Sequence, residues 1–60
     1  MEEDNFIEMI QDAIEMYDED EEVKNVQTFE EVGMLTMNKG IVVMMKDKSE
    51  FQITIVRSER

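Results

Sequence analysis

The fold is decided by residues 41–56, which read IVVMMKDKSEFQITIV. Residues 41–45 form an apolar run of strand length, and residues 51–56 alternate so that Phe51, Ile53 and Ile55 share one face. A period of two is typical of a strand with one buried face. The two segments therefore predict an antiparallel hairpin that turns at residues 46–49.

The length of that turn decides which side chains share a face of the hairpin. A three-residue loop pairs Val43 with Phe51 and gathers one dense apolar face. A two-residue loop at residues 47–48 would shift the register by one and bring Val42 to that face instead. Because a two-residue hairpin loop favours glycine at the position of Lys48, we expect the longer loop.

With the longer loop, a candidate partner surface lies on the hairpin face turned away from the rest of the core. It consists of Val42, Met44, Thr54 and Val56. Met44 is its strongest candidate contact, because flexible methionine side chains are common on adaptable binding surfaces. The other internal methionines are expected to fill gaps in a small core; they are Met9, Met16, Met34, Met37 and Met45.

Residues 5–17 predict an N-terminal amphipathic helix. At about 100° per residue, its apolar side chains cover roughly half of the circumference, and Glu8, Asp12 and Glu15 fall on the opposite side. Asn5 is expected to cap the first turn, with Glu8 in the capping-box position. So wide an apolar face indicates a helix that is deeply packed or shares its face between two partners.

The segment between helix and hairpin begins with five consecutive acids at residues 18–22, which predict a solvated connection. Residues 23–29 are a weaker strand candidate. Thr28 and Glu31 have the spacing to cap a single turn that Gly33 closes. Residues 34–37 look extended, and residues 38–40 read as a turn in which Gly40 can adopt positive φ.

These segments predict one α+β domain over residues 1–60, with the helix packed on a small antiparallel sheet (αβββ). The sheet spans about residues 23–57 and has three to four strands, while residues 18–22 form the acidic connection. A chain of 60 residues buries a small core, and small domains often gain stability by oligomerising.

The charge is concentrated in the N-terminal half. The chain carries a net charge of −10, and thirteen of its sixteen acids lie in residues 1–31, so the two halves carry −12 and +2. Such a chain is repelled by phosphate backbones and anionic membranes, so we expect no direct nucleic-acid or membrane binding. A basic protein partner and a purely solubilising role both stay open. The candidate acidic surface is Glu8, Asp12, Glu15, Asp18, Glu19, Asp20, Glu21 and Glu22.

Catalytic and metal chemistry have few suitable residues. The chain has no cysteine and no histidine, which removes disulfides, thiolate zinc sites and the commonest general base. A calcium loop starting at Asp18 would need glycine sixth and glutamate twelfth, where Val23 and Phe29 stand. We therefore expect no enzyme, no metal site and no cofactor. The acidic start at residues 1–4 is unlike a targeting signal, and we expect a cytoplasmic protein.

Residues 29–56 carry a recurring pattern of turn and strand residues. It reads F-x-x-x-G-x-L-T-x-x-x-G-I-V-V, followed by S-E-F-Q-I-T-I-V. In this it resembles small uncharacterised bacterial and phage-encoded proteins. The resemblance implies no activity and suggests a mobile-element origin.

Two functions fit these observations. The first is a small acidic interaction or assembly module, forming a homodimer that buries its outer sheet face or joins edge strands. The alternative is a DNA-mimic inhibitor, whose acids would occupy a basic nucleic-acid-binding protein.

Overall fold

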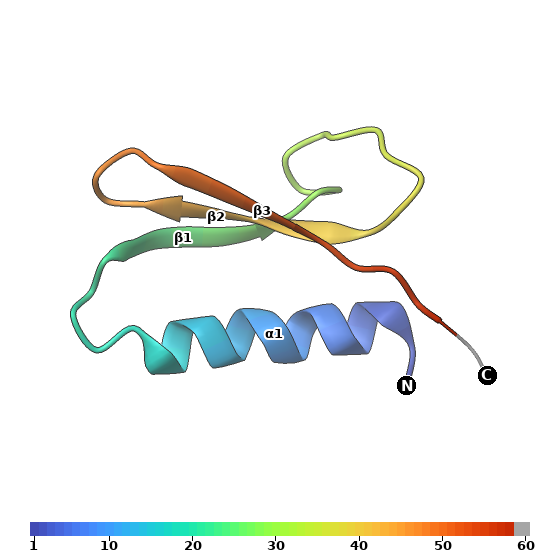
Figure 1. Cartoon of the computed structure of the whole chain (residues 1–60), viewed down its shortest axis with the longest axis horizontal. Helices are drawn as coiled ribbons and strands as arrows, with labels where there is room; N and C mark the ends of the chain where they lie inside the picture. The colour runs from blue at the N-terminus through green and yellow to red at the C-terminus, as the bar shows by residue number, and fades with distance from the viewer. Residues whose placement is uncertain (59–60) are drawn as a thin grey trace.

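A computed structural model describes residues 1–58 and places one helix against a three-stranded antiparallel sheet (Figure 1). The elements are α1 (Glu3–Tyr17), β1 (Val23–Thr28), β2 (Gly40–Met45) and β3 (Glu50–Thr54). The strands lie in the order β1-β2-β3, so β2 is central. The predicted α+β class and the helix-on-sheet arrangement are confirmed.

The helix begins two residues earlier than the sequence predicts. Its N-cap is Glu2, which has the extended backbone of a cap residue but makes no side-chain capping bond. Asn5 lies inside the first turn, so its predicted capping role is wrong. Glu3 and Asp4 instead favour the helix start through their charge, because negative groups stabilise the positive end of the helix dipole.

The acidic connection is shaped by Asp18. Its carboxylate accepts backbone N–H bonds from Glu22 at 2.8 Å and Val23 at 3.0 Å, which fixes the approach to β1. Glu21 has a positive φ of 52° in the same turn. Asp18 is therefore a structural residue as well as part of the acidic surface.

The hairpin of β2 and β3 has the predicted three-residue register. Val43 pairs with Phe51 and Ile41 with Ile53, in a ladder without a bulge. Lys48 adopts a positive φ of 75°. A turn followed by one left-handed residue is a common way to close a three-residue hairpin loop, and it suits the twist of the strands. β3 ends at Thr54, two residues before the predicted end.

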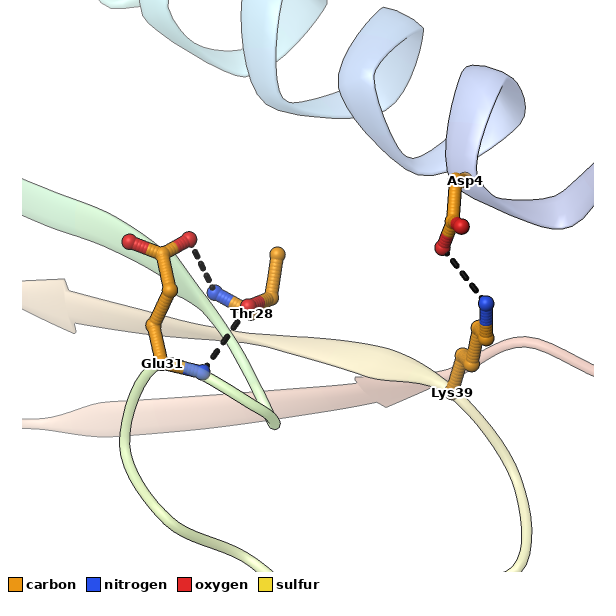
Figure 2. A network of polar contacts seen from close by, with 4 residues as sticks. All are labelled: Asp4, Thr28, Glu31 and Lys39. Atoms are coloured by element: carbon orange, nitrogen blue, oxygen red, sulfur yellow. Dashed lines mark hydrogen bonds and ion pairs between the residues drawn. The ribbon is translucent and has the colours of Figure 1, made fainter.

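The loop from β1 to β2 begins with the predicted capped turn (Figure 2). The backbone N–H of Glu31 donates to the Thr28 hydroxyl at 3.0 Å, and the Thr28 N–H donates to the Glu31 carboxylate at 3.2 Å. Gly33 closes the turn with a φ of 77°. The rest of the loop crosses the sheet face opposite α1 (Figure 1).

Gly40 departs from its predicted role. It is the first residue of β2 and has no positive φ. An added Cβ would lie 2.3 Å from the Ile53 carbonyl oxygen and 2.5 Å from the ring of Phe29. Glycine stands here because Phe29 and the neighbouring strand come so close to its backbone.

The core lies between α1 and the first two strands. Ile7, Ile41 and Val43 are its buried centre, surrounded by Ile10, Ile14, Val23, Val26, Met45 and Ile55. α1 contacts β1 and β2 but not β3. The sheet is therefore only partly covered on its helix side.

Candidate interaction surface

The helix leaves two apolar side chains of β3 uncovered. Phe51 and Ile53 lie on the same sheet face as Val43 and Ile41, because directly paired residues point to the same side. That face is the one against which α1 packs. Yet Phe51 is 57% exposed and Ile53 is 39% exposed. Their exposure follows from the position of α1 above β1 and β2.

The orientation of α1 brings a second set of apolar residues to the same side. The Gln11 amide donates to the Val26 carbonyl of β1 at 3.4 Å, so this flank of the helix faces β1. At about 100° per residue, Ala13 and Tyr17 lie on the opposite flank, which faces the β3 side. Tyr17 is 87% exposed. We refer to the exposed apolar residues on the β3 side of the helix and on the helix side of β3 as the open apolar face; they are Ala13, Tyr17, Phe51 and Ile53.

A groove with acidic walls adjoins this face at the C-terminal end of α1. Its apolar floor comes from Ile10, Ala13, Tyr17 and Met45, among others. Its rim carries Asp18, Glu19, Asp20 and Glu22. The groove combines apolar anchoring positions with negative charge, which suits a basic protein segment carrying an apolar side chain.

The predicted partner surface is divided by the structure. Val42 lies on the outer sheet face but is only 5% exposed, and Gly40, on the same face, is approached closely by the ring of Phe29. Met44 is half-buried and Thr54 is exposed. Val56 lies beyond β3, in a shallow cleft with Met1 and Phe6. Of the predicted partner surface, Val42 is therefore buried, while Thr54 and Val56 are accessible to a partner.

The methionines also differ from expectation. Met45 packs against the core as predicted. Met16 and Met37 do not fill core gaps, since both side chains are largely or fully exposed. Leu35 is likewise fully exposed in the extended part of the 29–39 loop. The apolar residues outside the core therefore gather on one helix flank, on β3 and on this loop.

The acids of the helix form an exposed row on the flank away from β3. Glu8, Asp12 and Glu15 are all exposed, and within residues 1–58 none of them forms an ion pair. Asp4 differs, because it accepts a hydrogen bond from the Lys39 ammonium at 2.7 Å (Figure 2). This bond raises the pKa of Lys39 and ties the helix start to the end of the 29–39 loop. Both groups are exposed, so the pair adds little stability.

Metal-binding groups and membrane-spanning helices can be looked for directly among the described residues. Within residues 1–58, no group of three side chains is placed to hold a metal ion. No helix in this part of the chain has the length and apolar character needed to cross a membrane.

No protein-family model, curated protein sequence or solved structure matches this chain. The resemblance of residues 29–56 to bacterial and phage-encoded proteins therefore stays a prediction. The proposal of a function therefore depends on the open apolar face and on the exposed acids of α1.

Proposed function

We propose that this chain is a protein-interaction module that binds through its open apolar face. The observation that supports the proposal most directly is the exposure of Phe51 and Ile53 on the helix side of β3. A monomeric domain gains stability by burying such side chains. Exposed aromatic and β-branched residues beside a helix flank are typical of surfaces that a partner covers.

Affinity capture from a native extract tests this proposal. The wild-type chain is compared with the double variant Phe51→Thr/Ile53→Thr, which keeps good strand-forming residues on β3. Gln52→Thr is the matched control, since Gln52 lies on the other face of the same strand. We expect partners that survive high salt, are lost in the double variant and are retained by the control. Identical partner sets for wild type and double variant would refute the proposal.

The acidic surface supports a second candidate, a DNA-mimic inhibitor. The row of Glu8, Asp12 and Glu15 forms no ion pair with the rest of residues 1–58, and it carries its charge on the flank away from the open apolar face. A basic nucleic-acid-binding partner would be released by salt, because exposed charges are screened within about 8 Å at physiological ionic strength. In the same affinity capture, a DNA-mimic inhibitor should lose its basic partner in the triple variant Glu8→Gln/Asp12→Asn/Glu15→Gln. Capture of that partner should be unaffected by the substitutions in β3.

A further inference from the structure

β3 is an edge strand without the usual protection of an edge. Its one neighbour in the sheet is β2. Its one charged residue is Glu50, at the start of the strand, and its ladder with β2 has no bulge, so the register shift in β1 is what distinguishes the two edges. β1, the other edge, has both a charged residue, Lys24, and a register shift between Val23 and Asn25. Charges and bulges discourage edge-to-edge pairing, so the two edges differ in their capacity to bind another strand.

The backbone of β3 presents an ordered set of hydrogen-bonding groups to that edge. Two residues at the ends of β3 form hydrogen bonds on the β2 side. The Ser49 carbonyl accepts a bond from the Met45 N–H, and the Ile55 N–H donates to the Lys39 carbonyl. Since bonding alternates along an antiparallel pair, the N–H and C=O groups of Glu50, Gln52 and Thr54 point outward. An added strand would find three evenly spaced pairing positions.

The accessible surface is large for a chain of this size. The chain exposes 5109 Å². A compact monomer of 7.1 kDa exposes about 4,100 Å², so the excess is about 1,000 Å². A stable interface buries about 800 Å² per partner. The Cα radius of gyration of 12.1 Å likewise exceeds the ~10 Å of a compact 60-residue domain.

The distribution of charge leaves this edge open to a second copy. The net charge of −10 opposes self-association in general. The exposed acids Glu8, Asp12 and Glu15 lie on the flank of α1 away from β3, however. The residues around β3 carry both signs, with Lys46, Lys48 and Arg57 against Asp47 and Glu50, and the C-terminal half carries a formal charge of +2. Two copies meeting at β3 therefore bring together the least acidic part of each chain.

We propose that two copies of this chain pair antiparallel through the outer edges of β3, about a two-fold axis, into a continuous six-stranded sheet. This inference rests on the proposed function and names the second copy as the partner. Full overlap of Glu50–Thr54 centres the register on Gln52. Phe51 of each copy then lies opposite Ile53 of the other, an aromatic and β-branched pair that favours sheet formation. Both pairs lie on the helix side, between the two helices.

Sedimentation velocity with two charge-matched variants tests the pairing and its register. We expect the wild-type mass to be twice the 7.1 kDa of one chain. Phe51→Lys places like charges at the centre of the interface and is expected to raise the dissociation constant at least ~30-fold. Thr54→Lys places its charge opposite Glu50 of the second copy and is expected to retain the dimer. Both positions are exposed, so both variants should fold, which circular dichroism checks.

Gln52→Pro supplies an independent variant. It removes an N–H that points outward and leaves the bonds to β2 in place, so it should give a monomer. Gln52→Thr keeps that N–H and should stay dimeric.

A wild-type chain that sediments at the single-chain mass up to about 1 mM overturns the dimer, because specific interfaces of this size bind far more tightly. Equal dissociation by Phe51→Lys and Thr54→Lys, or a dimeric Gln52→Pro, also overturns it. The proposed function fails on a different observation, partner capture that is independent of Phe51 and Ile53. If the wild-type chain is a monomer but captures a partner that the Phe51→Thr/Ile53→Thr variant does not, the dimer is overturned and the proposed function stands.

Discussion

At the scale of single residues, Gly40 has the most specific environment. Its hydrogen is the only side group that fits between the Ile53 carbonyl and the Phe29 ring, where a Cβ would lie within 2.3 and 2.5 Å. We expect Gly40→Ala to lower the free energy of unfolding by about 3 kcal/mol, since crowding a packed site forces backbone shifts. Urea denaturation followed by circular dichroism measures this loss.

Gly33→Ala is the control for that substitution. Nothing lies within 4 Å of its added Cβ, but its φ of 77° is left-handed. The expected loss is about 1 kcal/mol from backbone strain alone. A Gly40→Ala variant no less stable than Gly33→Ala would contradict the packing described around Phe29.

The hydrogen bonds to Asp47 predict how the stability of the fold depends on pH. The hydroxyl and backbone N–H of Ser49 both donate to its carboxylate and lower the pKa of Asp47. A depressed folded-state pKa stabilises the fold above the unfolded value of about 3.9, and the contribution is lost as the pH falls through the folded-state pKa. Ser49→Ala should move the pKa of Asp47 up, toward its ordinary value.

Carbon-detected NMR titration of the Asp47 carboxyl measures that shift. Ser58→Ala, which changes the same residue type outside the turn, should leave the titration unchanged. The stability difference between wild type and Ser49→Ala should be present near neutral pH and vanish in acid. An unchanged Asp47 titration in Ser49→Ala would show that the hydroxyl does not hold the turn.

At the scale of elements, the β2–β3 turn is closed by a residue that is strained there. Lys48 has a φ of 75°, which costs a side-chain-bearing residue about 1–2 kcal/mol. Lys46→Gly removes the same charge and raises the backbone entropy of the unfolded chain by the same amount, at a position without positive φ. Thermal unfolding should therefore find Lys48→Gly more stable than Lys46→Gly by about 1 kcal/mol. Equal stability of the two variants would argue against the three-residue turn.

The start of α1 lacks a side-chain cap. Glu2 has the backbone of an N-cap, with φ −77° and ψ 154°, but no capping bond. Aspartate has the shorter side chain that reaches the N–H groups of the first turn, so Glu2→Asp should stabilise the chain by about 0.5–1 kcal/mol. Glu3→Asp, which also preserves charge, lies inside the helix and should cost a few tenths of a kcal/mol. Chemical denaturation that ranks Glu3→Asp above Glu2→Asp would place the helix start elsewhere.

The local features of these elements could be predicted from the sequence because local chemistry determines them. The capped turn follows from the spacing of Thr28 and Glu31. The hairpin register was predicted correctly, but Lys48 does not explain it, because Lys48 has a positive φ in the three-residue loop as well. Gly40 and Val42 could not be predicted in the same way. The environment of Gly40 depends on the ring of Phe29, eleven residues away in the sequence, and the burial of Val42 depends on contacts that only the folded chain makes.

The open apolar face was also harder to predict, because it depends on how elements far apart in the sequence are placed relative to one another. The alternation of residues 51–56 correctly places Phe51 and Ile53 on the helix side. It does not reveal that α1 contacts β1 and β2 and leaves β3 uncovered. The wide apolar face of the helix left open whether it is deeply packed or shared between two partners. The exposure of Ala13 and Tyr17 shows that the sheet does not cover all of it.

At the scale of the whole molecule, the core is incomplete on one side. The buried centre of Ile7, Ile41 and Val43 continues into the exposed Phe51 and Ile53 without a covering element among residues 1–58. A second copy joined at β3 would extend the sheet and enclose these side chains between two helices. The unprotected edge, the excess surface and the distribution of charge all favour that arrangement.

Isotope-filtered NMR on a mixture of labelled and unlabelled chains detects the pairing of two β3 strands itself. Pairing centred on Gln52 should give intermolecular NOEs between the Phe51 ring of one copy and the Ile53 methyl groups of the other. Their absence at about 1 mM, with the intramolecular Phe51–Val43 contacts intact, would contradict it.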